Sequence, residues 1–156
     1  MDYKRLGHKT IRLLYEDFKE HFNKGNIIIG GSFYYKRIGC DVYTEYKDVD
    51  IFVDNNKDEI LHEILNYVEL KYNPSSIFHK FYPSSGLIGS FTIDGYLSVD
   101  ILRDDFSNLL PPIEIIPGVW SYELSYKASY DAYKKLSDIL NNKKYKKIEE
   151  FFESKL

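Results

Sequence analysis

The stretch Ile27-Ile28-Ile29-Gly30-Gly31-Ser32 decides how the rest of this 156-residue sequence is interpreted. Its three isoleucines form a short apolar run between Gly25-Asn26 and a pair of glycines, which is typical of a buried strand. Glycine permits close backbone approach to a ligand, and a Gly-Gly-Ser turn that leads into a helix can present N–H groups to phosphate oxygens. The pattern therefore predicts a strand that ends in a phosphate-binding turn at Gly30, Gly31 and Ser32.

A second stretch, Asp48-Val49-Asp50-Ile51-Phe52-Val53, alternates in the manner of a strand. Asp48 and Asp50 would point to the same face, where two carboxylates repel each other unless a cation lies between them. A third acid, Asp100, lies in an expected later strand. Mg²⁺ prefers hard oxygen ligands, and a third carboxylate allows a second ion. We expect two Mg²⁺ ions, with Mn²⁺ as an alternative, on Asp48, Asp50 and Asp100.

The other elements are expected from hydrophobic periodicity and turn residues. The sequence predicts a helix at 3–23, a short helix and a loop within 33–46, a helix at 57–71, and strands at 77–82, 87–93 and 96–102. Asp94-Gly95 between the last two strands predicts a hairpin.

The remainder of the chain is expected to be irregular and then helical. Pro111-Pro112 and Pro117-Gly118 predict an irregular crossing, and Ser121 is expected to cap a helical region. Asn141-Asn142 predicts a break before a final lysine-rich helix. One stripe of the helical region carries Tyr122, Tyr126, Tyr130 and Tyr133. The fold class is α+β, a small mixed β-sheet with flanking helices. We expect a single domain over residues 1–156, with a core at 26–102 and a C-terminal helical region at 121–155.

Composition narrows the function classes. A formal net charge of -3 argues against a general nucleic-acid binder, and the single Cys40 excludes a disulfide framework. No apolar run is long enough to span a membrane, and the basic N-terminus lacks the apolar segment of a signal peptide. We therefore expect a cytoplasmic protein without a membrane partner. The richness in Lys, Asn, Tyr and Ile is typical of an AT-rich genome, such as that of a low-GC bacterium or its phage.

These residues resemble the nucleotidyltransferase superfamily related to DNA polymerase beta, particularly its minimal kanamycin-type and toxin–antitoxin-type members. That family combines a strand, Gly-Gly or Gly-Ser, a short helix, Asp-x-Asp or Asp-x-Glu on the next strand and a later third acid. Gly31-Ser32, Asp48, Asp50 and Asp100 match this pattern over roughly residues 26–102. Fifteen residues separate Ser32 from Asp48, more than is usual in the family, and we do not select Asp41 within that interval because it lacks an acid two residues later.

The resemblance implies transfer of a nucleoside monophosphate from an NTP such as ATP to an acceptor hydroxyl, with release of pyrophosphate. The acceptor would be a protein, a tRNA end or a small molecule. Because the chain is small, we expect that a protein partner presents the acceptor. Gly30, Gly31 and Ser32 would bind the phosphates, and the three aspartates would hold the metal, with Asp100 as a candidate base. Relatives often place a lysine on the helix after the third acidic strand, which makes Lys127 the candidate for phosphate contact.

Several features have simpler interpretations. The histidines lack metal-ligand spacing, Cys40 is expected to be structural, and Lys36 and Arg37 are secondary candidates for phosphate contact. The tyrosine stripe favours core packing over base stacking. The lysine run at 143–147 favours a solvated face over nucleic-acid contact. The alternative functions are a non-catalytic module that binds a nucleotide, nucleic acid or protein, and a structural protein whose aspartates cap loops.

Overall fold

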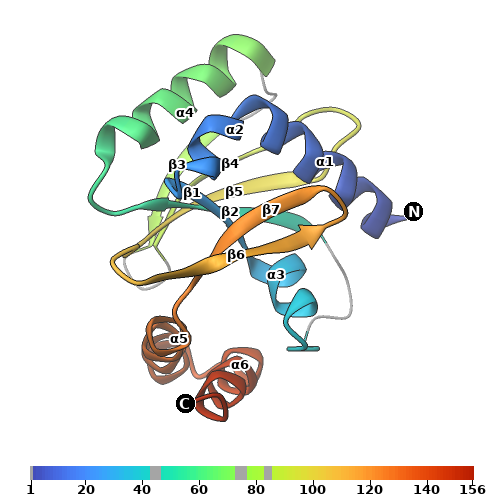
Figure 1. Cartoon of the computed structure of the whole chain (residues 1–156). Coiled ribbons are helices and arrows are strands. Elements are labelled where there is room, and N and C mark those ends of the chain that lie inside the picture. Colours follow the sequence, from blue (N-terminus) through green and yellow to red (C-terminus); the bar gives the residue numbers. More distant parts are fainter. Residues whose placement is uncertain (1, 43–46, 73–76, 83–85) are drawn as a thin grey trace.

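A computed structural model describes residues 2–42, 47–72 and 86–156, together with the backbone of residues 77–82 (Figure 1). Within these ranges the chain is mixed α and β, with six helices, a five-stranded sheet and a two-stranded sheet. The elements are α1 (Tyr3–Asp17), α2 (Lys19–Asn23), β1 (Ile27–Gly30), α3 (Gly31–Arg37), β2 (Asp48–Asp54), α4 (Asp58–Tyr72), β3 (Ile77–Tyr82), β4 (Leu87–Phe91), β5 (Ser98–Asp104), β6 (Leu109–Ile116), β7 (Val119–Leu124), α5 (Tyr126–Leu140) and α6 (Lys143–Glu153). No helix in the described ranges is long and apolar enough to cross a membrane.

The larger sheet has the strand order β1-β2-β5-β4-β3. β2 and β5 run parallel, and every other neighbouring pair is antiparallel, which confirms the predicted small mixed sheet. The parallel pair is in direct register from Asp48 opposite Ser98 to Asp54 opposite Asp104. Because the register is direct, residues of the same parity on the two strands share one face of the sheet.

One face of the sheet carries the hydrophobic core. Val49, Ile51 and Val53 of β2 are fully buried, and they alternate with Asp48, Asp50 and Phe52 as the sequence predicted. Helices α1 and α4 contribute residues at helical spacing to the same cluster. The core residues of β2, α1 and α4 whose side chains have no measurable exposure include Val49, Ile51, Val53, Ile11, Leu14, Ile64 and Val68. In Figure 1, α1 and α4 lie above the sheet, whereas α5 and α6 lie below it.

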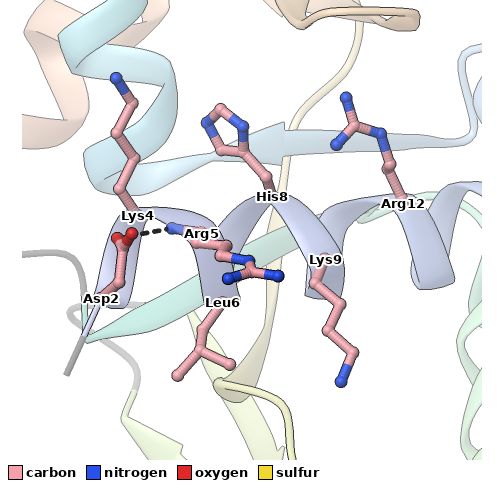
Figure 2. A pocket seen from close by; sticks show the side chains of 7 residues that line it. All are labelled: Asp2, Lys4, Arg5, Leu6, His8, Lys9 and Arg12. Atoms are coloured by element: carbon pink, nitrogen blue, oxygen red, sulfur yellow. Dashed lines mark hydrogen bonds between the residues drawn. The ribbon is translucent and has the colours of Figure 1, made fainter.

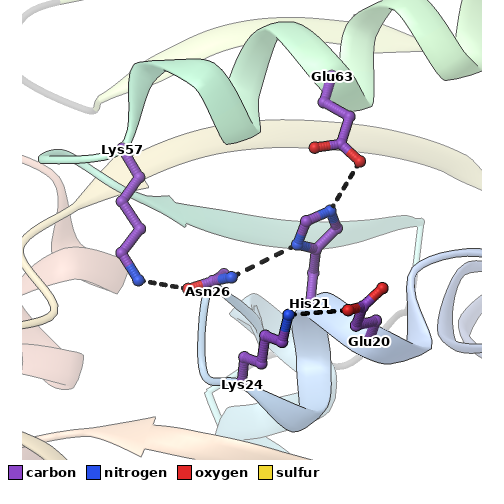
Figure 3. A network of polar contacts seen from close by, with 6 residues as sticks. All are labelled: Glu20, His21, Lys24, Asn26, Lys57 and Glu63. Atoms are coloured by element: carbon purple, nitrogen blue, oxygen red, sulfur yellow. Dashed lines mark hydrogen bonds and ion pairs between the residues drawn. The ribbon is translucent and has the colours of Figure 1, made fainter.

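The N-terminal helical region is divided into two helices rather than one helix over 3–23. α1 ends at Asp17 and α2 begins at Lys19, with Phe18 between them at φ -117. Phe18 and Phe22 are both buried, and the change of direction lets both rings reach the core. A polar network joins this region to α4: the Asn26 amide contacts His21, and the His21 ring contacts Glu63 at 3.2 Å (Figure 3).

The predicted irregular crossing at Pro111–Gly118 is wrong, because β6 and β7 form a hairpin there. Pro111 and Pro112 are exposed within β6, where the register shifts between Leu110 and Ile113. Proline has no N–H to donate to a neighbouring strand. Strands therefore tolerate proline at edges and at bulges, and the register shift in β6 is such a bulge. Pro117-Gly118 provides the turn, with Gly118 at φ +82.

Ser121 does not cap a helix, which is a second correction. Ser121 lies buried on β7, and its Oγ accepts a hydrogen bond from the Ile29 N–H at 2.9 Å, at the edge of β1 that faces away from β2. The cap of α5 is Ser125, whose Oγ accepts from the Ala128 N–H at 3.1 Å. Both serines precede an apolar stripe, so sequence alone gave the wrong choice between them.

The remaining predictions are largely confirmed. β4 and β5 are antiparallel neighbours, although their connection spans 92–97 rather than the two residues Asp94-Gly95. Asn141 ends α5 in the left-handed conformation, and the Asn142 side chain caps α6. Tyr126, Tyr130 and Tyr133 pack partly buried against the core, as expected, whereas Tyr122 belongs to β7. Predictions that concern 43–46 lie outside the described residues.

Candidate functional site

The structure brings the three predicted aspartates together on one face of the sheet. Asp50 of β2 is directly opposite Asp100 of β5, and Asp48 lies two residues before Asp50 on the same face. Asp48 is exposed, and Asp50 and Asp100 are half-buried. Since β2 and β5 are separated by about fifty positions in sequence, only their parallel pairing creates this cluster.

The electrostatics of the cluster follow from its crowding. Burial raises the pKa of the Asp50 carboxyl to about 8, and the negative charges of Asp100 and Asp48 and a hydrogen bond with Asp100 act in the same direction. Burial, and then the charge of Asp100, also raises the pKa of Asp48. The crowding of three carboxyl groups thus disfavours the ionised form of Asp50 in the absence of a cation.

The glycine turn passes directly against Asp50. Gly30 pairs with Asp50 across β1 and β2, and Gly31 follows at φ +69, a conformation that other residues rarely adopt. A Cβ at Gly31 would lie 1.8 Å from the Asp50 Oδ2, so a side chain there would displace the carboxylate. A Cβ at Gly30 would lie 2.2 Å from the Phe52 ring. Glycine at both positions is thus what allows the turn and the acidic cluster to be adjacent.

Ser90 adds a positioning contact. Its Oγ donates a hydrogen bond to the Asp100 Oδ1 at 2.5 Å, from β4 on the far side of β5. This contact fixes the position of one carboxylate oxygen of Asp100. Sequence analysis did not select Ser90, because its pairing with Asp100 depends on the register of β4 against β5.

The acidic cluster lies in a cavity of about 1000 Å³ between this face of the sheet, β7 and the C-terminal helices. Beyond the aspartates, most of the lining is apolar or aromatic, and Lys135 and Arg103 bring positive charge to it. The residues that line it include Gly30, Gly31, Tyr34, Tyr35, Asp48, Asp50, Phe52, Asp100, Leu102, Arg103, Tyr122, Glu123, Leu124, Tyr133, Lys135, Leu136 and Tyr145. A cavity of this size and character suits a nucleotide-sized ligand.

Glu123 and Tyr34 form a second polar element of this cavity. Tyr34 Oη donates to the Glu123 Oε1 at 3.1 Å, and both side chains are buried. Burial is the main cause that raises the pKa of each group. Sequence reasoning missed this pair because residues 121–124 were expected to begin a helix; recognising β7 would have placed Ser121 and Glu123 on one face.

Two predicted site residues are not among those that line the cavity. Ser32 is buried at the start of α3. Lys127 is 66% exposed and forms an ion pair with Asp131 at 2.7 Å on the surface of α5. The secondary candidates are also engaged elsewhere: Lys36 pairs with Asp41, and the Arg37 Nε donates to the Glu114 carbonyl at 2.7 Å. The described lysine that borders the cavity is Lys135, two helical turns beyond Lys127.

The aspartates suit a hard divalent cation in ligand type and in backbone placement. Carboxylate oxygens are the donors that Mg²⁺ prefers, and the raised pKa of Asp50 means that its ionised form lacks the counter-charge that a cation would supply. As they stand, no three His, Cys, Asp or Glu side chains among the described residues form a ready metal-binding group. Binding an ion would therefore require a side chain of the cluster to rotate, and Asp48 is exposed and able to do so.

The chain matches no model of a known protein family. The search of curated proteins finds no similar sequence.

Proposed function

We propose that the protein is a Mg²⁺-dependent nucleotidyltransferase that transfers a nucleoside monophosphate from an NTP to an acceptor hydroxyl. The observation that carries the proposal is the register of Asp50 opposite Asp100, with the Gly31 backbone against Asp50, in the lining of a nucleotide-sized cavity. A phosphate-binding turn and a carboxylate cluster are the two parts that phosphoryl transfer requires next to each other.

In this proposal the chain's own residues bind, orient and accept a proton. The backbone at Gly30 and Gly31 approaches the triphosphate, because neither position has a side chain to keep it away. Asp48, Asp50 and Asp100 hold the cation. When bound, Mg²⁺ neutralises phosphate charge and makes the acceptor hydroxyl more acidic. The apolar and aromatic lining of the cavity, which includes Phe52 and Tyr133, accommodates the nucleoside.

The proposed reaction is an in-line displacement. The acceptor oxygen forms a bond to the α-phosphorus, and the bond from that phosphorus to the bridging oxygen breaks, so that its electron pair leaves with pyrophosphate. The hydroxyl proton passes to a carboxylate, for which Asp100 is the candidate because Ser90 fixes its orientation. Positioning and charge neutralisation account for most of the rate in such reactions.

A second candidate is a non-catalytic module that binds a nucleotide in the same cavity. What favours it is the raised pKa of Asp50, caused first by burial and then by the charges of Asp100 and Asp48, because a proton on this carboxyl lowers the charge of the cluster without an ion. In this case ligand affinity would be independent of Mg²⁺, and the aspartates would act as hydrogen-bonding groups.

One experiment separates the two candidates. The purified chain is incubated with each of four α-labelled NTPs, Mg²⁺ and pools of RNA or protein acceptors, and NTP binding is measured by calorimetry with Mg²⁺ or with EDTA. For the transferase we expect Asp48→Asn plus Asp50→Asn to reduce transfer by at least ~10³-fold, since it removes two of three metal ligands. Asp41→Asn, an exposed aspartate paired with Lys36, is the matched control and should leave transfer unchanged.

Transfer that survives the double substitution would exclude the proposed site. If no transfer occurs with any acceptor, but NTP binds equally well with Mg²⁺ and in EDTA, the binding module is the correct function.

A further inference from the structure

The first helix carries a strongly basic face that the proposed active site does not use. Between Tyr3 and Tyr15 the sequence contains no acidic residue, in a chain whose net charge is -3. The face lines a surface hollow of about 920 Å³ with Asp2 and Leu6 (Figure 2). We call it the α1 basic face, and it consists of Lys4, Arg5, His8, Lys9 and Arg12.

The geometry of the α1 basic face suits a repeating anion. Lys4, His8 and Arg12 follow one another at intervals of one helical turn and extend to the same side of α1, whereas Lys9 extends to the other side (Figure 2). All but His8 are exposed. Lys9 also lies over the Tyr96 ring, with its Nζ 4.3 Å from the ring centroid. Exposed lysines and arginines gathered on one helix beside an aromatic ring are typical of surfaces that bind nucleic acid.

The α1 basic face adjoins the two segments that lead into the acidic cluster. On one side, Lys9 Nζ donates to the Gly95 carbonyl at 3.2 Å and Thr10 Oγ1 accepts from the Leu97 N–H, immediately before β5 begins. The first residue of β5, Ser98, pairs with Asp48. On the other side, the His8 ring is 6.2 Å from the ring of Phe33, two residues after Gly31.

We propose that the α1 basic face binds the phosphate backbone of a nucleic acid. A strand held there runs beside the start of β5 and the start of α3, and its terminal hydroxyl is the acceptor of the transfer; this last assignment rests on the proposed function, whereas the binding does not. A membrane surface fits less well, because the apolar side of α1 is occupied: Ile11 and Leu14 are fully buried in the core and are not available for insertion.

Binding is tested with a fluorescein-labelled 20-nucleotide RNA of mixed sequence and the same DNA sequence, by anisotropy over a range of salt concentrations. The patch variant is K4Q/R5Q/K9Q, which leaves the Arg12 contact to the Pro117 carbonyl intact. The matched control, K143Q/K144Q/K147Q, removes the same charge from α6. We expect the patch variant to bind at least ~10-fold more weakly and to lower the salt slope by about 2, and the control to change affinity less than ~2-fold.

A second readout reports on His8 directly. Burial and then the charges of Arg12 and Lys4 hold the pKa of His8 below its usual value. A phosphate bound beside it counteracts those charges, so the His8 pKa measured by NMR should rise in the presence of the RNA. This titration is made in the unsubstituted protein and does not depend on whether a variant folds.

Three results would overturn the proposal: no binding to either oligonucleotide, equal weakening by the control variant, or binding of poly-glutamate or phosphatidylserine vesicles as strong as that of RNA. The Asp48→Asn plus Asp50→Asn variant separates this inference from the proposed function. If this variant still binds RNA and the unsubstituted chain transfers no nucleotide to the RNA, the nucleic-acid surface stands and the bound strand is not the acceptor; if the unsubstituted chain also transfers no nucleotide to any other acceptor, the transferase is wrong. If transfer occurs but K4Q/R5Q/K9Q shows an unchanged KM for RNA, the surface is wrong and the transferase stands.

Discussion

The two faces of β2 differ although they alternate along a single strand. Val49, Ile51 and Val53 are fully buried against α1 and α4, whereas Asp48 and Asp50 border the cavity on the opposite face. β5 repeats the division, with Ile101 buried and Asp100 half-buried. The apolar face stabilises the fold, and the acidic face concentrates like charges that destabilise it in the absence of a counter-ion. The comparison of the two faces indicates that an acidic site of this kind depends on a hydrophobic core on the opposite face of the same strands.

The largest expected effect is on the apolar face. Ile51→Ala should lower the free energy of unfolding by about 3–4 kcal/mol, because it removes a fully buried side chain and leaves a cavity. Chemical denaturation at fixed pH measures the loss. Ile139→Ala on α5 is the control, since Ile139 is 56% exposed and should change stability by less than about 0.5 kcal/mol. Equal effects of the two substitutions would mean that the face behind the aspartates is not the core.

The acidic face should respond in the opposite direction. The pKa of Asp50 is raised to about 8 in the fold, against about 4 in an unfolded chain, so between these values the folded state binds the extra proton. Stability is therefore highest below about pH 4 as far as this group is concerned, and it falls as the pH rises towards 8. Asp50→Asn cannot ionise, and in EDTA at pH 8 it should be more stable than the unsubstituted protein by about 2 kcal/mol.

Thermal unfolding between pH 5 and pH 9 checks this prediction, with Asp41→Asn as the control that should retain the slope of the unsubstituted protein. Mg²⁺ with an NTP should stabilise the unsubstituted protein but not Asp50→Asn, if the carboxylate holds the ion. A variant that is less stable than the unsubstituted chain at pH 8 would show that Asp50 is not destabilised by its neighbours.

The contrast between the faces also explains how much could be predicted from sequence. Alternation in residues 48–53 and the apolar run at Ile27–Ile29 are local signals, and both strands were predicted correctly. The position of Asp50 opposite Asp100 depends on the register between two strands that are distant in sequence. The sequence indicated this proximity only through the order of its motifs. The position of Glu123 in the cavity could not be predicted. Pro111-Pro112 indicated an irregular segment in place of β6, so the residues of β7 were predicted to begin a helix. Lys127 was chosen by analogy, and its position on α5 is set by the cap at Ser125.

The smallest expected effect concerns the contact between turn and cluster. Gly31 and Gly39 both have positive φ, at +69 and +92, but a Cβ at Gly31 would meet Asp50 at 1.8 Å, whereas a Cβ at Gly39 would have nothing within 4 Å. Alanine at either position carries the conformational cost of about 1–2 kcal/mol. Gly31→Ala must also move the Asp50 carboxylate, so it should lower the free energy of unfolding by about 1 kcal/mol more than Gly39→Ala.

The control is Gly31→Ala in an Asp50→Asn background. The amide occupies the same space as the carboxylate, so the extra loss of stability should persist. An extra cost that disappears there would mean that charge, not space, requires glycine at the turn.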